Sequence, residues 1–292
     1  MKIIVCVKQV PGTTKVDMDP DTGVLRRDGA DAKLNPYDLY AVEAALALSE
    51  AAAEGGGDAG GSGVGGGMGC GGAGSSGVGG SAGGVTSISM GPPRAREALL
   101  ETVYMGVDQA VLLNDACFAG SDVLATAYTL SRGISLIGFD VIICGRQTTD
   151  GDTAQVGPEL AEFLGIGHIA GVLSIQPHKG ALIVAAGRDD CIVTQCIAPP
   201  CLLCVDGGIN TPRLPSYKRK RSIASDPVRI MGLSDFGGDG ADDGGFFGLS
   251  GSPTQVERIY PPPGGIGREL IAGSGGQVAA RLADVIAEHK FL

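Results

Sequence analysis

Hydrophobic segments of two kinds alternate along the first half of the chain. The shorter kind is rich in β-branched residues, has the length of a buried strand, and covers residues 2–10, 85–90, 110–113 and 141–144. The longer kind carries apolar residues every three or four positions and covers residues 35–53, 94–105, 122–134 and 158–164. This alternation predicts an α/β fold with a doubly wound, mostly parallel sheet, for which we expect a flavodoxin-like strand order.

The pattern changes after residue 170. Three further apolar runs, at residues 171–175, 181–186 and 191–197, predict additional antiparallel strands, and residues 201–205 predict a last strand. We therefore expect residues 1–205 to form one α/β domain. Residues 206–292 would then hold an exposed loop and an extended C-terminal arm that ends in an amphipathic helix.

One stretch of the first half has no hydrophobic pattern. Eighteen of the thirty residues from Gly55 to Gly84 are glycine, and most of the others are serine or alanine. Such a segment cannot bury enough apolar area to offset the entropy lost on ordering. We expect a flexible insert, and because no Gly-Lys-Ser/Thr follows the glycines, we do not expect a phosphate-binding P-loop.

The polar loop after the strand at residues 141–144 is the strongest candidate for a binding site. The strand breaks at Gly145, and the next helical pattern resumes at Pro158, which has no amide hydrogen and fits only the first turn of a helix. Five preceding amides then have no obvious acceptor within the helix. Free amides between a strand and a helix form a site for an anion such as a diphosphate. These amides belong to Thr153, Ala154, Gln155, Val156 and Gly157.

An ordinary strand–helix connection is the alternative interpretation of this loop. Its length favours a ligand site, since such connections usually have about two to six residues. Asp150, Gly151 and Asp152 form its centre. The two carboxylates would repel a phosphate placed directly against them, so we expect them to cap backbone amides or to accept hydrogen bonds from ribose hydroxyls.

Composition narrows the class of function. The net charge of −10 argues against nucleic acid or an anionic membrane as the main partner. No run approaches the roughly 20 apolar residues of a membrane span, so we expect no membrane insertion. Lys8 interrupts the short apolar run at the N-terminus, so we expect no signal peptide. The eight cysteines lie mostly in apolar runs, which is typical of reduced thiols in a cytoplasmic protein. Cys201 and Cys204 have the spacing of a zinc pair, but in a strand they would point to opposite faces, so we expect no metal site.

A proline-containing segment and a basic cluster follow the last strand. Two prolines between Ile209 and Tyr217 argue against a helix or strand, so we expect this segment to be exposed. The next four residues, Lys218 to Arg221, are all basic. They are either a solvated face or a docking site for an acidic surface of another protein.

Six short motifs together resemble the β subunit of electron transfer flavoprotein. The resemblance covers nearly the whole chain apart from the glycine-rich insert, and the loop motif is the most specific part of it. The motifs are Lys2–Pro11 (KIIVCVKQVP), Asn35-Pro36, Ser89–Pro92 (SMGP), Gly145–Pro158 (GRQTTDGDTAQVGP), Asn210–Pro215 (NTPRLP) and Gly248–Pro253 (GLSGSP).

This resemblance implies a heterodimer with an α subunit that carries FAD. It also implies that residues 206–292 hold a partner recognition loop and a C-terminal arm that packs on the α subunit. The β pocket of the family holds AMP, or in electron-bifurcating members a second FAD that accepts a hydride from NADH; the motifs here are closer to the second group, so we expect FAD. The resemblance also assigns Asn210–Tyr217 to the docking of acyl-CoA-type or other dehydrogenases. The cofactor-binding positions it implies are Val7, Lys8, Asn35, Pro36, Asp38, Met90, Gly91, Arg146, Asp150, Gly151, Asp152, Thr153, Ala154, Gln155, Val156 and Gly157.

Two other classes of function remain as alternatives. A non-redox regulatory module that binds an adenine nucleotide would use the same pocket without transferring electrons. A hydrolase is disfavoured because the sequence places no Ser/His/Asp set. Of its three histidines, we expect His168 in a loop or at the edge of the core, His178 in a turn and His289 near the C-terminus, and we expect no catalytic residue in this chain.

Overall fold

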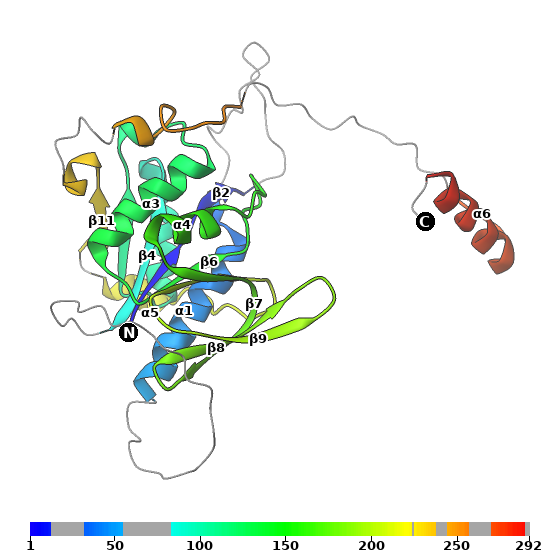
Figure 1. Cartoon of the computed structure of the whole chain (residues 1–292), viewed down its shortest axis with the longest axis horizontal. Helices are drawn as coiled ribbons and strands as arrows, with labels where there is room; N and C mark the ends of the chain where they lie inside the picture. The colour runs from blue at the N-terminus through cyan, green and yellow to red at the C-terminus, as the bar shows by residue number, and fades with distance from the viewer. Residues whose placement is uncertain (13–31, 55–82, 224, 238–243, 257–269, 290–292) are drawn as a thin grey trace, which may run out of the picture. The chain divides into compact units, whose positions relative to one another are not determined.

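The computed structural model describes residues 1–12, 32–54, 83–223, 225–237, 244–256 and 270–289 (Figure 1). These residues form two compact units. The first holds the described residues up to Gln255, and the second holds Val256 and residues 270–289. The glycine-rich segment 55–82 lies outside the described residues.

The first unit is built on a nine-stranded sheet with the order β11-β5-β4-β1-β6-β10-β7-β8-β9. Parallel pairing joins the strands from β11 to β7, and antiparallel pairing joins β7, β8 and β9. The predicted α/β class, with its mostly parallel sheet and added antiparallel strands, is confirmed. The strands are β1 (Lys2–Cys6), β4 (Gly84–Met90), β5 (Gln109–Leu113), β6 (Val141–Gly145), β7 (Gly167–His178), β8 (Ala181–Gly187), β9 (Ile192–Ile197), β10 (Cys201–Val205) and β11 (Val228–Met231).

The strand order itself differs from the flavodoxin-like order. The chain runs from β1 outward to β4 and β5, and then crosses back so that β6 pairs with the other side of β1. In order of appearance, the first four strands of the sheet therefore lie as 3-2-1-4, which is the dinucleotide-binding order. Hydrophobic periodicity indicates where each strand lies in the sequence, but it does not indicate which strands pair with each other. The pattern alone therefore could not distinguish the two strand orders.

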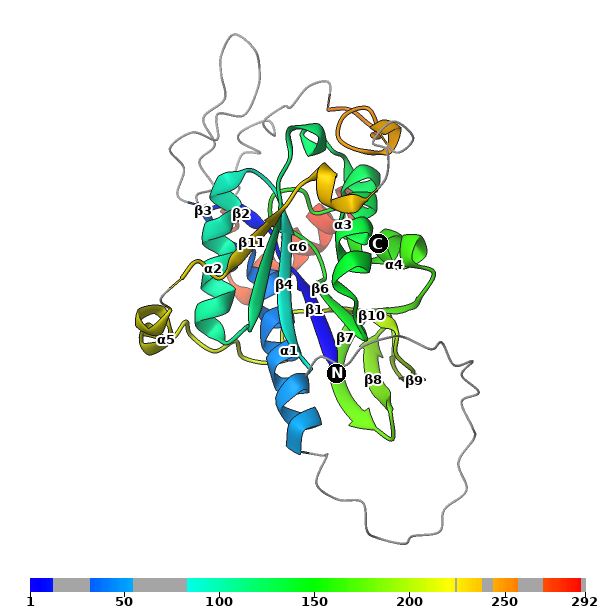
Figure 2. The same cartoon turned by 90° about the vertical axis from the view of Figure 1, so that its left-hand side faces the viewer.

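Helices cover both faces of the sheet. Helices α1 (Pro36–Glu54) and α2 (Arg96–Met105) lie on one face, and α3 (Val123–Ile137) and α4 (Val156–Leu164) on the other, as Figure 2 shows. Each strand contributes alternate side chains to the two cores, since Ile3 and Val5 face α1 whereas Ile4 and Cys6 face the opposite helices. The doubly wound arrangement follows from this alternation.

The first predicted strand, residues 2–10, is two strands. The chain leaves the main sheet after Cys6, and β2 (Gln9–Pro11) pairs antiparallel with β3 (Ala32–Leu34) in a separate two-stranded sheet. The backbone turns at Lys8, whose amide donates to Asp38 at the start of α1 instead of continuing the ladder. This turn places Val7 and Lys8 at the edge of the sheet.

The antiparallel extension begins inside β7. Gly171 has a φ of 71°, and a Cβ there would lie 3.0 Å from the carbonyl oxygen of Gly187, so only glycine fits this point on the strand. β7 pairs with β10 from Gly167 to Val172, and it pairs with β8 from Val172 onward. On β10, Cys201 packs in one core and Cys204 in the other, as the strand periodicity predicts.

The residues after β10 add short elements to the first unit. They are α5 (Tyr217–Ser222), β11 at the edge of the main sheet, and the single 3-10 turns η4 (Leu233–Phe236) and η5 (Gly244–Phe246); η2 (Pro93–Ala95) and η3 (Ala116–Phe118) lie earlier in the chain. The second unit is the amphipathic helix α6 (Gly275–Glu288), close to the predicted C-terminal helix. No described helix is long and apolar enough to cross a membrane.

Candidate functional site

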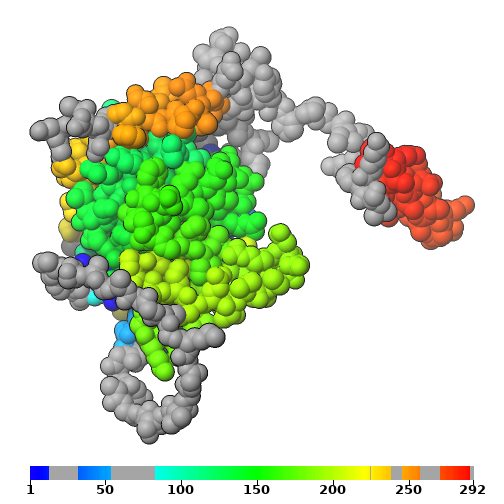
Figure 3. Space-filling model, in the orientation of Figure 1, coloured from blue at the N-terminus to red at the C-terminus, as the bar shows by residue number. Residues whose placement is uncertain are grey.

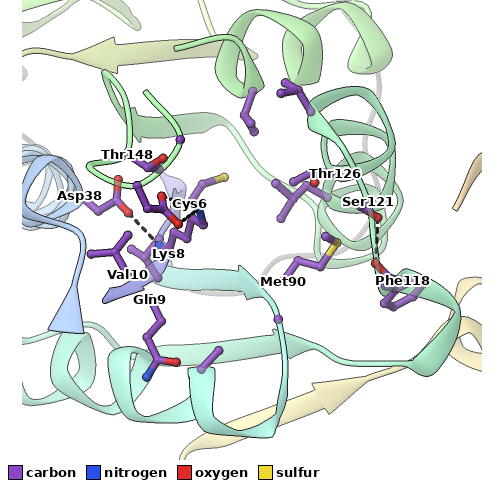
Figure 4. Close-up of a pocket in the computed structure, with 18 of the residues that line it drawn as sticks. Cys6, Lys8, Gln9, Val10, Asp38, Met90, Phe118, Ser121, Thr126 and Thr148 are labelled. Atoms are coloured by element: carbon purple, nitrogen blue, oxygen red, sulfur yellow. Dashed lines mark hydrogen bonds and ion pairs between the residues drawn. The ribbon is translucent and has the colours of Figure 1, made fainter. Parts of the chain in front are cut away.

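A cavity of about 730 Å³ opens where the strands β1, β4, β5 and β6 end. It lies where the chain direction across the sheet reverses, between β1 and β6, the place where ligands bind in open α/β sheets. In Figure 4, Lys8, Asp38 and Thr148 lie on one side of the cavity, and Met90, Thr126 and Ser121 lie on the other.

Thirteen of the sixteen residues predicted to bind a cofactor line this cavity. The structure therefore brings together segments more than a hundred residues apart in the chain. The thirteen are Val7, Lys8, Asp38, Met90, Gly91, Arg146, Asp150, Gly151, Thr153, Ala154, Gln155, Val156 and Gly157. Asn35, Pro36 and Asp152 do not line it.

Asn35 does not line the cavity but holds the loop after β6 in place. Its fully buried side chain donates from Nδ2 to the carbonyl of Gln147 (2.9 Å) and accepts at Oδ1 from the amide of Thr149 (3.2 Å). Because both ends of the side-chain amide are used, this one residue fixes the position of the loop after β6. Pro36, at the first position of α1, begins the helix that carries this support.

The loop backbone presents free amides to the cavity. Asp152 and Ala154 have positive φ angles of 52° and 55°, a conformation that is costly for a residue with a Cβ atom. Gln155, next in the chain, is right-handed, and a left-handed residue before a right-handed one turns successive N–H groups to one side. Among the described residues, none of the amides from Thr153 to Gly157 donates to an acceptor.

Helix α4 begins at Val156, two residues before the position predicted from Pro158. Proline is still in the first turn, so its missing amide costs the helix nothing. Gly157 sets the approach of this helix to the sheet, because a Cβ there would overlap the sulfur of Cys204 on β10. The absence of that Cβ lets the amides at the start of α4 reach the strand ends.

The two loop carboxylates form hydrogen bonds with side chains of the protein, and their predicted bonds to ribose hydroxyls stay a prediction. Lys8 Nζ lies 2.7 Å from both carboxylate oxygens of Asp150, and Asp152 accepts a hydrogen bond from Gln147 Nε2. Burial tends to raise the pKa of Asp150, but the hydrogen bond and charge of Lys8 hold it below its ordinary value. The ion pair therefore reduces the negative charge that a bound phosphate would meet.

Asp38 is the buried carboxylate of the site. It accepts from the amide of Lys8 at 2.8 Å, and a Cβ on Gly145 would lie 2.5 Å from its Oδ1, so α1 packs closely against the end of β6. Burial raises the pKa of Asp38 to about 7, against the opposing effects of hydrogen bonds from Asn35 and the Lys8 amide. This carboxyl therefore changes charge near neutral pH.

Sequence reasoning missed the opposite side of the cavity. The residues after β5 and at the start of α3 line it, including Asn114, Asp115, Phe118, Ser121 and Thr126. Polar residues directly after a predicted strand, here Asn114 and Asp115, were the signal that would have pointed to them. A hydrogen bond fixes this side of the cavity to the end of β4, since Asn114 Nδ2 donates to the carbonyl of Gly91 at 2.8 Å.

Residues 244–256 lie over the start of α3 (Figure 3). Ser252 Oγ accepts from the amide of Asp122 at 2.8 Å and donates to the carbonyl of Gly248 at 2.7 Å. Phe247 packs between Phe118 and Phe236, with ring centroids 5.5 and 5.9 Å away. The motif Gly248–Pro253 therefore fixes the helix start that borders the cavity.

No group of three or more His, Cys, Asp or Glu side chains in the described part of the chain could hold a metal ion. The cavity lining includes the loop from Thr153 to Gly157, the basic side chains of Lys8, Arg94 and Arg146, and the apolar residues Phe118 and Leu130.

Comparison with known proteins agrees with this geometry. A model of the electron transfer flavoprotein domain matches residues 77–229. The electron transfer flavoprotein subunit β of Clostridium acetobutylicum is 36% identical over 258 residues, covering 88% of this chain and 87% of that protein. The chain belongs to the electron transfer flavoprotein β-subunit family.

The alignments with two other relatives span almost all of this chain. The subunit CarD of the caffeyl-CoA reductase-Etf complex of Acetobacterium woodii is 35% identical over the whole of both chains. Protein FixA of Bradyrhizobium diazoefficiens is 34% identical over 98% of this chain and 91% of its own length. The family resemblance noted in the sequence motifs is confirmed.

Proposed function

We propose that this chain binds an adenine nucleotide in the cavity and, in a heterodimer with an electron transfer flavoprotein α subunit, passes electrons between a dehydrogenase and an acceptor. FAD is the preferred nucleotide, with AMP as the alternative. The observation that carries this proposal is the set of free amides from Thr153 to Gly157 at the reversal point of the sheet. Backbone N–H groups in this position are the typical ligands of a diphosphate.

The residues present fit such a nucleotide. The amides and the positive end of α4 would hold the phosphates, and the Lys8–Asp150 pair would sit beside them. Asp38 and the loop residue Thr148 would form hydrogen bonds with ribose hydroxyls, while Val7 and Met90 would contact the base. A bound flavin would supply the redox chemistry, and the chain's part is to hold it and exclude water.

The shape of the cavity supports FAD over AMP. Beyond the phosphate-binding side it continues to Phe118, Thr126 and Leu130 on the α3 side. A mononucleotide held by the loop would leave that apolar side uncovered, whereas a second ring system would fill it. The volume of about 730 Å³ is in the upper half of the range for ligand cavities, roughly 300–1,000 Å³.

Partner docking would use the segment after β10. Leu214 is 87% exposed and Tyr217 is 71% exposed, and the basic residues of α5 follow directly. Exposed apolar side chains beside basic ones fit a partner with an apolar pocket and an acidic rim. Because the relative CarD is named as part of a caffeyl-CoA reductase complex, we expect an acyl-CoA-type dehydrogenase as partner, with NADH as a further electron donor.

The test is to coexpress the chain with its α subunit, release the nucleotides from the purified complex, and identify them by mass. We expect two FAD per heterodimer, and one FAD with one AMP would indicate the simpler carrier. Electron transfer is then measured by adding an acyl-CoA dehydrogenase with its substrate, or NADH, and following the flavin absorbance. A complex that holds nucleotide but accepts no electrons would replace this proposal with the regulatory-module alternative.

A further inference from the structure

One arginine ties the middle of the docking segment to the body of the protein. Residues 206–216 contain no regular helix or strand, yet Arg213 in their middle makes five hydrogen bonds to α1. Its Nε and Nη2 donate to the two oxygens of Glu43 at 2.8 and 3.0 Å, and Nη1 and Nη2 donate to Glu50 at 2.8 and 3.2 Å. The backbone amide of Arg213 also donates to Glu43 at 3.0 Å.

These contacts leave the Arg213 guanidinium with few free donors. A guanidinium has five N–H groups, and four hydrogen bonds here go to two carboxylates in a fixed planar arrangement. The Glu43 side chain is only 13% exposed, so this part of the network is shielded from solvent. Hydrogen bonds from Arg213 also lower the pKa of Glu50, which keeps that carboxylate charged.

Arg213 and its neighbour Leu214 therefore have opposite environments. The arginine side chain is 35% exposed and faces α1, whereas Leu214 is 87% exposed. Further contacts fix the segment on both sides, since Asn210 donates to the carbonyl of Tyr40 on α1 at 3.0 Å and the amide of Ser216 donates to the carbonyl of Tyr104 on α2 at 2.9 Å.

We propose that Arg213, Glu43 and Glu50 form a clamp that presents Leu214 to the partner protein, and that Arg213 is a positioning residue that does not itself contact the partner. The docking role of Leu214 rests on the proposed function, but the clamp does not. The clamp lowers the entropy that the segment would lose on docking.

The same helix connects the clamp to the nucleotide site. Asn35 and Asp38, at the start of α1, hold the nucleotide loop and the Lys8 amide. Glu43 lies five residues after Asp38, about 7.5 Å further along the helix axis at 1.5 Å per residue. One rigid element therefore sets the position of the docking residue relative to the bound cofactor.

The experiment uses the full αβ complex and two measurements. Trypsin cleavage after residues 218–221, followed by mass spectrometry, reports release of the segment without any partner. The KM for an acyl-CoA dehydrogenase reports docking. The variants are Arg213→Ala, the double variant Glu43→Gln/Glu50→Gln, their combination, Leu214→Ala, and the control Glu97→Gln, which neutralises an exposed carboxylate on α2.

We expect Arg213→Ala and the double glutamate variant each to speed cleavage and raise the KM about tenfold, the effect of losing one charged hydrogen bond. The combined variant should add nothing further, because all three residues act in one network. Saturating partner should restore the rate, while Leu214→Ala should raise the KM without changing cleavage. Glu97→Gln should match the unmodified protein in both measurements.

Two results would overturn the clamp. If none of the clamp variants changed cleavage, the segment would be held by other contacts. If Arg213→Ala raised the KM but the double glutamate variant did not, Arg213 would be contacting the partner directly. A third result would separate the two proposals. If the clamp variants were cleaved faster but no variant, Leu214→Ala included, changed the KM, the clamp would be supported and the docking part of the proposed function would be refuted. Should Arg213→Ala fail to fold, Arg213→Lys keeps the charge but loses the fork of donors, and the same outcomes apply.

Discussion

Two loops leave neighbouring strands at the same edge of the sheet and are built in opposite ways. Gly145 at the end of β6 pairs with Val205 at the end of β10, and an ion pair of 2.9 Å joins the next residue of each strand, Arg146 and Asp206. The loop after β6 exposes backbone amides in a strained conformation. The segment after β10 is held to α1 by side-chain hydrogen bonds, and it exposes Leu214.

The proposed function assigns a different kind of ligand to each of these two loops. A diphosphate needs several hydrogen-bond donors converging on one point, which only backbone amides at the start of a helix provide without added charge. A protein partner needs an apolar side chain on a rigid base, which prolines and the Arg213 clamp provide. The following variants test this contrast, starting with the largest expected effect.

Gly157→Ala should disable the first loop. The new Cβ would overlap the sulfur of Cys204 and push α4 away from the strand ends. Overpacking of this kind costs up to about 3 kcal/mol, so nucleotide affinity should fall about a hundredfold in titration calorimetry. The control is Gly151→Ala in the same loop, whose Cβ would meet its nearest neighbour, Thr148 Oγ1, at an ordinary 3.5 Å. Equal affinity of Gly157→Ala and the unmodified protein would contradict the role given to the start of α4.

Asn35→Ala should remove the side-chain hydrogen bonds that hold the same loop in place. The carbonyl of Gln147 and the amide of Thr149 would both lose their partner, which should lower the free energy of unfolding by about 2 kcal/mol. Chemical denaturation of the complex measures this. The docking segment should keep its trypsin resistance, because its contacts lie further along α1. Loss of that resistance would mean that the two loops are not independently held.

Asp38→Asn should change how stability depends on pH. Burial raises the pKa of Asp38 from 3.8 to about 7, so the folded protein holds a proton that the unfolded chain has released. The stabilisation from this proton is complete below the lower value and is lost as pH rises through the higher one. The variant does not titrate here, so its unfolding free energy should rise relative to that of the unmodified protein as the pH increases from about 4 to about 8. Parallel curves for the two proteins would show that this carboxyl stays ionised in the folded state.

Leu214→Ala should have the smallest effect and should be limited to docking. Removing an exposed leucine leaves the fold unchanged, so thermal stability and nucleotide content should be unaffected. The KM for an acyl-CoA dehydrogenase should rise about tenfold, the cost of one anchor side chain. A fall in nucleotide content would place Leu214 in the structure of the first loop instead.

The hydrophobic pattern by itself determined the α/β class, the approximate positions of the main-sheet strands up to β10 and of the helices α1 to α4 and α6, and the polar loop between β6 and α4. Each of these depends on residues close together in the chain. Only the tertiary structure decided the strand order, the turn at Lys8 that ends β1, and the side of the cavity formed by Phe118 and Thr126. It also assigned Arg213 to α1 through carboxylates 163 and 170 residues away in the chain. Contacts over such separations leave no periodic trace in the sequence, since they depend on which elements the folded sheet places side by side.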